Sequence, residues 1–208
     1  RVARKRRRIA DDGDRTIVPV RLEPSGSVFI VFRKPSGNAD PIVALQQSPA
    51  GASMDVEVEN SGAVMVASST GGDYAFRTAS GRTLKAQLPQ APAAIEIQGP
   101  WELRFPPNWG APDKVALDKL ISWPESPDAG VKYFSGTATY VKGFDLPADL
   151  FAPGRTLVLN LGEVKQIATV RVNGKDLGVI WKPPFEIDTT GALKAGANSL
   201  EIDVTNFW

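Results

Sequence analysis

The sequence predicts an all-β protein whose C-terminal half is an antiparallel β-sandwich or jelly roll, preceded by smaller β segments. Two observations support this fold class. Short apolar segments alternate with polar residues at every second position, which is the period of half-buried strands. Nineteen Gly and 17 Pro residues are scattered between those segments rather than gathered in one tract, as expected for many short strands joined by turns.

The composition excludes several kinds of active site. The chain has 208 residues, of which 42% are hydrophobic and 23% charged, as in ordinary globular proteins. It contains no Cys and no His. Disulfides, zinc–thiolate centres, cysteine nucleophiles and Ser-His-Asp arrangements are therefore excluded, and only carboxylate, Lys, Arg or Tyr chemistry remains. No window approaches 18 apolar residues, so we expect no membrane partner.

Basic residues concentrate at the start of the chain. The cluster consists of Arg1, Arg4, Lys5, Arg6, Arg7 and Arg8. Such a cluster can be an arm that binds nucleic acid or a targeting signal. No aromatic residues for base stacking are interleaved with these charges, so we interpret the cluster as a solvated strand or chain end and expect no nucleic-acid partner.

Residues 1–34 predict the closing strands of an upstream β-domain. A turn at Asp12-Gly13 precedes an alternating segment, Thr16–Leu22, and a second turn leads to a wholly apolar run, Val28–Phe32. Alternation followed by an unbroken apolar run is typical of a half-exposed strand paired with a buried one. Two strands do not stand alone in water, so we expect their partners to precede Arg1 in a longer chain.

Residues 35–94 predict a linker followed by a small antiparallel β region. The stretch Pro35–Pro41 is rich in Pro, Ser, Gly and Asn, as linkers are. Alternating pieces then occur at Val56/Val58, Tyr74/Phe76 and Leu84/Ala86/Leu88, with turns at Asn60-Ser61-Gly62, Gly71-Gly72 and Ser80-Gly81. The small side chains of this region offer a core of modest volume.

Residues 95–208 carry the strongest strand pattern and predict the sandwich. We expect strands at Ile95/Ile97, Trp101–Phe105, Phe134–Val141, Leu157–Leu161, Ile167–Val172, Leu177–Trp181, Phe185–Ile187 and Leu200–Val204. Strands at such regular intervals, with turn residues between them, are typical of a sandwich or jelly roll. Lys114–Ile121 is compatible with one short helix. The expected core includes alternate residues of two strands, Val170, Val172, Leu200, Ile202 and Val204.

The pair Asn173-Gly174 predicts a two-residue β-hairpin. It joins the apolar positions of Ala168–Val172 to those of Leu177–Val179. A type I′ hairpin turn needs positive φ at both central residues, and Asn and Gly adopt positive φ at the least cost.

Four motifs lie between Leu157 and Asn206. They are Val172-Asn173-Gly174, Leu177-Gly178, Pro184-Phe185 with Asp188 and Thr190, and Lys194-Ala195-Gly196-Ala197-Asn198-Ser199-Leu200. Together they resemble the family 2 sugar-binding domain of glycoside hydrolases. The resemblance implies a sandwich of the galactose-binding-domain-like type.

A second group of motifs lies upstream. It comprises Gly99-Pro100-Trp101, Phe105–Pro112, Leu120–Trp123 and Lys132–Tyr140. With the weaker segment Thr16–Phe32, these motifs resemble the C-terminal region of family 106 glycoside hydrolases, the α-L-rhamnosidases. Members of that family are large, secreted or periplasmic bacterial enzymes in which a catalytic barrel precedes such β-domains. The resemblance implies a secreted or periplasmic fragment that lacks the barrel and its catalytic carboxylates.

Aromatic side chains in turns or at strand ends are the candidates for sugar contact. A pyranose ring stacks its C–H face on an indole or phenol while neighbouring polar groups bond its hydroxyls. The candidate carbohydrate-binding residues are Trp109, Trp123, Tyr133, Trp181, Lys182 and Asn173, with Asn108 and Lys132 as further polar neighbours. The alternative is that these aromatics plug the ends of the sandwich or dock it on the missing barrel.

The acidic residues give no clear active site. Glu163, Glu186 and Asp188 lie near the family motifs, but glycoside hydrolysis needs two carboxylates held on opposite sides of a sugar. Asp188 is better explained as a turn residue bonded to backbone N–H groups. The run Asp11-Asp12-Gly13-Asp14 could offer oxygens to a structural calcium ion, although a turn is the favoured interpretation. We therefore assign no catalytic residue, no metal ligand and no cofactor.

The sequence thus predicts a non-catalytic accessory sugar-binding-type domain of an α-L-rhamnosidase-like glycoside hydrolase. Such a domain would support the catalytic barrel or shape the substrate entrance, and the chain alone would be inactive. Its partners would be carbohydrate or the missing catalytic domain of the same polypeptide. The alternative is an independent carbohydrate-binding module that anchors an enzyme to polysaccharide.

Overall fold

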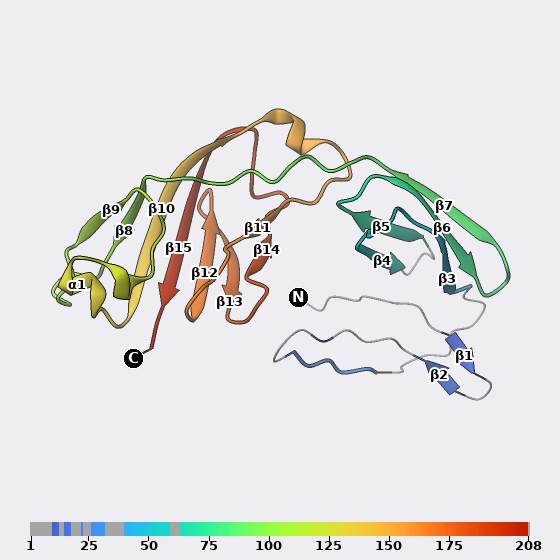
Figure 1. The fold of residues 1–208 in the computed structure, drawn as a ribbon, viewed down its shortest axis with the longest axis horizontal. Coiled ribbons are helices and arrows are strands. Elements are labelled where there is room, and N and C mark those ends of the chain that lie inside the picture. The colour runs from blue at the N-terminus through green and yellow to red at the C-terminus, as the bar shows by residue number, and fades with distance from the viewer. Residues whose placement is uncertain are drawn as a thin grey trace. The chain divides into compact units, whose positions relative to one another are not determined.

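The computed structural model of the chain describes residues 10–12, 15–17, 22, 26–31, 40–58 and 63–207. The described residues form antiparallel β-strands with only short helical turns (Figure 1), which confirms the predicted all-β class. The chain divides into two compact units. The first comprises residues 1–22 and 26–93, and the second comprises residues 94–208 together with residues 23–25.

The first unit begins with a short hairpin. Strands β1 (Ala10–Asp12) and β2 (Arg15–Ile17) pair so that Asp12 lies opposite Arg15. This register agrees with the turn predicted near Asp12-Gly13. Gly13, Asp14 and most of the predicted strand beyond Ile17 lie outside the described residues.

The expectation of a buried strand at Val28–Phe32 is wrong for its described part. Residues 26–31 are not in a strand, and Phe29 is 93% exposed. An apolar run is buried only where another surface covers it. The described core of this unit does not include these residues.

The remainder of the first unit consists of two small antiparallel sheets. Strands β3 (Ile42–Gln47), β6 (Gly72–Thr78) and β7 (Thr83–Leu88) form one sheet in the order β3-β6-β7, and β4 (Met54–Val58) pairs with β5 (Val64–Ser68). Its buried hydrophobic centre is Ile42, Tyr74 and Phe76. The predicted strands after residue 54 are therefore present, whereas β3 was not predicted. The predicted turn at Asn60-Ser61-Gly62 lies outside the described residues.

The second unit contains a six-stranded antiparallel sheet in the order β13-β12-β15-β10-β8-β9. The strands are β8 (Trp101–Arg104), β9 (Lys114–Leu117), β10 (Thr137–Leu146), β12 (Ile167–Val172), β13 (Lys175–Ile180) and β15 (Gly196–Thr205). Strands β11 (Val158–Asn160) and β14 (Glu186–Asp188) form a separate pair. The apolar residues that flank this pair, Leu159, Leu161, Phe185 and Ile187, pack against the core of the large sheet.

Alternation along the central strands places one face of the large sheet in the core. Ala168, Val170 and Val172 of β12 are buried, as are Leu200 and Ile202 of β15. Val204 is half-buried against the same cluster. These positions confirm the predicted core, since successive side chains of a strand point to opposite faces.

An aromatic cluster fills the core beneath β8 and β10. Trp123, in the 3-10 turn η1 (Trp123–Glu125), meets the rings of Phe105 and Phe134 edge to face. Its indole N–H donates to the Tyr140 hydroxyl at 2.7 Å, and burial raises the pKa of Tyr140. The buried polar end of the indole is therefore satisfied.

Two local expectations were wrong. Lys114–Ile121 is not a helix, because Lys114–Leu117 forms β9 and pairs with β8. Its alternate residues, Val115 and Leu117, face the core, so the segment follows the two-residue period. The one α-helical turn among the described residues, α1 (Ala129–Lys132), lies after it, and Asp128 caps it by accepting from the Val131 N–H. The predicted strand at Ile95/Ile97 is an irregular segment.

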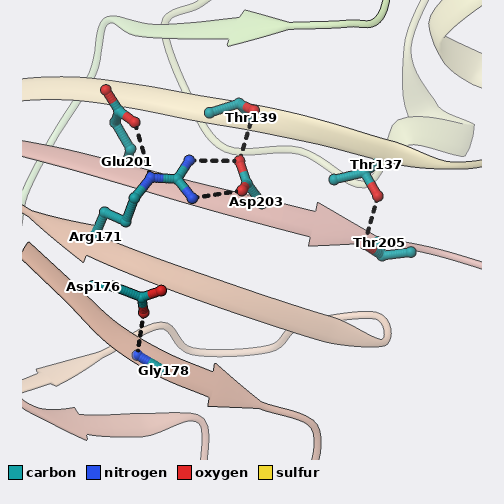
Figure 2. Close-up of polar contacts among 8 residues, drawn as sticks. All are labelled: Thr137, Thr139, Arg171, Asp176, Gly178, Glu201, Asp203 and Thr205. Carbon is teal, nitrogen blue, oxygen red and sulfur yellow. Dashed lines mark hydrogen bonds and ion pairs between the residues drawn. The ribbon is translucent and has the colours of Figure 1, made fainter. Parts of the chain in front are cut away.

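The Asn173-Gly174 hairpin is confirmed. Asn173 has φ 50° and Gly174 has φ 76°, the two positive values that the turn requires. Beyond it the register shifts, since Arg171 lies opposite Asp176 but Val170 lies opposite Gly178. The extra residue makes a β-bulge, which the Asp176 carboxylate stabilises by accepting from the Gly178 N–H (Figure 2).

Charged side chains cross-link the outer face of the large sheet. The Arg171 guanidinium of β12 forms two bonds to Asp203 of β15, at 2.8 and 3.0 Å, and a third to Glu201 (Figure 2). Thr139 of β10 donates to the same Asp203 carboxylate at 2.7 Å. Burial alone would raise the pKa of Asp203, but the hydrogen bonds from Arg171 and Thr139 outweigh it and lower the pKa. Three adjacent strands are thereby joined through one carboxylate.

Asn198 satisfies the backbone at the opposite end of β15. This side chain is 6% exposed. Its amide donates to the carbonyls of Lys194 and Gly196, while its carbonyl oxygen accepts from the Lys194 N–H and from the Asn173 amide. Asn198 is therefore the buried residue of the Lys-x-Gly-x-Asn-x-Leu motif whose hydrogen bonds hold the turn before β15 against the Asn173 hairpin.

We predict that Asn198→Ala lowers the free energy of unfolding by about 1–3 kcal/mol, because it removes the hydrogen bonds of a buried amide to the backbone of Lys194 and Gly196 and to the Asn173 side chain. The control is Asn160→Ala, whose side chain makes only exposed bonds and should change stability by about 0.5 kcal/mol or less. Urea unfolding of both variants measures the difference. Equal midpoints would show that Asn198 is not a structural centre.

Candidate functional site

The strand registers bring four chain segments to one end of the large sheet. Thr205, the last residue of β15, lies opposite both Thr137, the first residue of β10, and Ile167, the first residue of β12. Strand β13 finishes beside them, with Ile180 opposite Ala168. We call this end of the sheet, where these strands begin or finish, the Thr205 end. It is the lower end of the large sheet in Figure 1, and the hairpin between β12 and β13 lies at the other end.

Trp181 and Lys182 lie at the Thr205 end, directly after β13. The Trp181 side chain is 60% exposed. The Lys182 ammonium lies 6.0 Å from the centre of its ring, within the range of a cation–π contact. Both residues were predicted from the sequence as candidate carbohydrate-binding residues, and the structure places both at the Thr205 end.

Trp109 lies in the loop that joins β8 to β9 at the same end. The Phe105 N–H donates to the Asp113 carbonyl and closes this loop. Asn108 and Gly110 flank Trp109 with φ of 64° and 89°, so the chain turns sharply at the indole. The ring rests on Phe134, with ring centres 6.4 Å apart, yet remains 62% exposed.

Tyr133 ends helix α1 beside this loop. It is 74% exposed, and the Lys132 ammonium lies 5.6 Å from its ring centre. A Cβ at Gly130 would come within 2.2 Å of the Gly110 carbonyl, so only glycine lets α1 approach the Trp109 loop so closely. Tyr133 and Trp109 are thus held as neighbours by backbone packing.

Asn206 ties the end of β15 to the start of β10. Its side chain accepts from the Gly136 N–H at 2.9 Å and donates to the Phe134 carbonyl at 2.9 Å. A Cβ at Gly136 would lie 3.0 Å from the Trp109 ring, so this glycine makes room for the indole. Sequence reasoning missed Asn206 and Gly136, and it also missed Phe207, which is 59% exposed at this end.

Two of the predicted site residues do not join this group. Trp123 is only 7% exposed, and its position in the aromatic core shows that the expectation of a surface indole is wrong. Asn173 lies at the opposite end of the sheet. Its amide donates to Ala192 and Asn198, and its oxygen accepts from the Ser199 N–H, so its side chain serves the turn.

The candidate carboxylates have structural partners. Glu163 forms an exposed ion pair with Lys165 at 2.8 Å, and the hydrogen bond from Lys165 lowers the pKa of Glu163. A general acid of a glycosidase needs a raised pKa instead. Glu186 accepts from the Asn160 amide, and Asp188 accepts from the Thr190 N–H as a turn residue.

Other kinds of site find little support in the described part of the chain. No group of three or more acidic side chains that could hold a metal ion occurs there. Gly13 and Asp14 of the calcium candidate lie outside the described residues. No described helix is long and apolar enough to cross a membrane.

A surface depression of about 440 Å³ occurs on the first unit. Its lining includes Gln47, Asp73, Lys85 and Gln87. Tyr74 also lines it but is 1% exposed, so the depression offers no aromatic face for a sugar. The exposed rings at the Thr205 end of the second unit therefore remain the better candidate.

Comparisons with known proteins lead to glycosidases. No family model matches the chain. A Formosa agariphila protein named "Putative beta-glucuronidase" is 39% identical over 137 residues, covering 66% of this chain and 12% of that protein. The solved rhamnosidase from Novosphingobium sp. PP1Y has a TM-score of 0.52 and 26% identity, covering 81% of this chain and 21% of that one. A β-D-glucuronidase structure from Dictyoglomus thermophilum has a TM-score of 0.45 and 24% identity, covering 53% and 19%.

The chain thus spans about an eighth and a fifth of the first two proteins, both of which are named as glycosidases. The match to the rhamnosidase covers 81% of the chain, more than the second unit alone contains, so it extends into the first unit. The similarity supports a region related to segments of glycoside hydrolases.

We predict that replacing two tryptophans by alanine has very different effects on stability. Trp123→Ala should lower the free energy of unfolding by about 3–5 kcal/mol, because it empties part of the core. Trp181→Ala should change it by about 0.5 kcal/mol or less, since the indole is mostly exposed. Thermal unfolding of the two variants measures this, and similar losses in both would contradict the exposed placement of Trp181.

Proposed function

We propose that this chain is a non-catalytic accessory region of an α-L-rhamnosidase-like glycoside hydrolase. In this role it supports a catalytic barrel or shapes the substrate entrance of the same polypeptide, in a secreted or periplasmic bacterial enzyme. The observation that carries the proposal is the similarity to a rhamnosidase over 81% of this chain but only 21% of that enzyme. A region of that size leaves room in such an enzyme for a separate catalytic domain, which supports an accessory role for this chain.

The chemistry of the described residues supports an accessory role. Glycoside hydrolysis requires an acid and a base or nucleophile on opposite sides of the anomeric carbon. Glu163 is held ionised beside Lys165, and Asp188 bonds to a turn. The sequence has no His that could replace a carboxylate as the proton donor.

A second candidate function is an independent carbohydrate-binding module. The exposed rings of Trp109, Tyr133 and Trp181 favour it, because a scaffold that serves packing alone has no need of three exposed aromatics at one end of a sheet. Calorimetric titration with a glycan panel separates the two. A defined sugar bound with micromolar affinity favours the module, and millimolar or absent binding favours the scaffold.

We predict that the purified chain does not hydrolyse aryl α-L-rhamnosides or aryl β-D-glucuronides, because its candidate carboxylates, Glu163, Glu186 and Asp188, are engaged in an ion pair and hydrogen bonds of structural character. A longer polypeptide that joins this chain to its catalytic barrel should hydrolyse one of them and provides the control. Release of the aryl group by the chain at an enzymic rate, lost in Glu163→Gln or Glu186→Gln, would overturn the accessory role.

A further inference from the structure

The exposed aromatic residues of the second unit share one location. Among its described residues, the rings that remain more than half exposed are Trp109, Tyr133, Trp181 and Phe207. All four belong to segments that leave the large sheet at the Thr205 end. The other tryptophans that the structure describes in this unit, Trp101 and Trp123, are buried. Aromatic exposure is therefore a property of one end of the sheet and not of its surface in general.

A lysine ammonium lies close to each of two of these rings. The ammonium of Lys132 lies 5.6 Å from the Tyr133 ring centre, and that of Lys182 lies 6.0 Å from the Trp181 ring centre. Neither lysine forms an ion pair with a residue that the structure describes, whereas Lys165 at the same end is paired with Glu163. Each ring thus has a positive charge over one of its faces.

The acidic residues of the same connecting segments are Asp113, Asp118, Glu125, Asp128 and Glu163. Asp128 is engaged in capping α1, and Glu163 is engaged with Lys165. Asp113 lies at the β9 side of the Trp109 loop. The charged groups that contact the Tyr133 and Trp181 rings are the ammonium groups of Lys132 and Lys182.

The two aromatic–lysine pairs lie too far apart for one sugar ring. The start of β10, near Tyr133, and the end of β13, at Trp181, are separated by three strand-to-strand steps, which span about 14 Å. A ligand that touches both pairs must be an oligosaccharide. Stacking on the rings selects sugar faces, and the lysines select an anionic group on the sugar.

We infer that the Thr205 end binds an anionic oligosaccharide, with Trp181–Lys182 and Tyr133–Lys132 as two separate contact points and Trp109 as an additional platform. This inference rests on the proposed function, since it names the class of sugar that the accessory region holds. The anionic group is a carboxylate or a sulfate ester, since both present oxygens that a lysine ammonium can bond.

The test is calorimetric titration of the purified chain with hexamers of galacturonate, glucuronate and mannuronate. Each acid is compared with its methyl ester, which has the same rings without the charge, and a sulfated galactan hexamer distinguishes sulfate from carboxylate. At least one acidic or sulfated hexamer should bind about tenfold more tightly than its neutral counterpart, given that each of the two lysines contributes up to about fivefold. Raising the salt concentration should weaken that binding and leave the ester unaffected.

Matched variants locate the contact. Lys132→Gln and Lys182→Gln should each weaken binding of the acid about threefold without affecting the ester. Trp181→Ala should weaken both. Lys175→Gln, an exposed lysine at the Asn173 hairpin, is the control and should change neither. Thermal unfolding of each variant verifies that the fold is intact.

Three results would overturn the inference. They are equal affinity for an acid and its ester, binding that Lys175→Gln weakens as much as Lys182→Gln, and no binding of any hexamer by the folded chain. None of these results contradicts the non-catalytic accessory role, which is contradicted if the chain itself hydrolyses a glycoside. The two claims are therefore separable.

Discussion

The register of β15 is the constraint on which the second unit depends. This strand pairs along its whole length with β10 on one side and through residues 200–205 with β12 on the other, so it fixes both the core and the two ends of the sheet. A slip of one residue would turn Leu200 and Ile202 outward and break the bonds from Arg171 and Thr139 to Asp203. Hydrophobic alternation on one face and a charged clamp on the other therefore specify the same register.

Asparagine side chains near the two ends of β15 fix the neighbouring backbone by hydrogen bonds. Asn198 organises the turn before the strand, and Asn206 ties the segment after it to Gly136 and Phe134. Asn198, which belongs to the Lys-x-Gly-x-Asn-x-Leu motif, contributes to stability alone. Asn206 holds the backbone of Gly136 beneath Trp109, so the exposed ring packs on backbone that is fixed by hydrogen bonds. A rigid aromatic face loses little entropy when a ligand stacks on it.

The sequence predicted the strands whose alternation is strong and whose turns are distinctive. The β12–β13 hairpin, its positive φ values and the core residues of β12 and β15 follow from local chemistry alone. The errors arise where tertiary context decides. The Lys114–Leu117 segment is a strand because β8 lies beside it, and Trp123 is buried because its chain folds inward over Phe105. The gathering of Trp109, Tyr133 and Trp181 at one end depends on pairings between distant strands, which spacing along the chain does not reveal.

The placement of the aromatic–lysine pairs at one end is the central claim, and spin-label distances test it most directly. The chain has no Cys, so labels can be attached at Ser135→Cys, Asp145→Cys and Lys182→Cys without background. Positions 135 and 182 should be roughly 15–20 Å apart, since three strand steps separate them, whereas positions 145 and 182 should be roughly 30 Å apart, since most of the length of β10 intervenes. Equal distances, or a shorter distance for positions 145 and 182, would contradict the account.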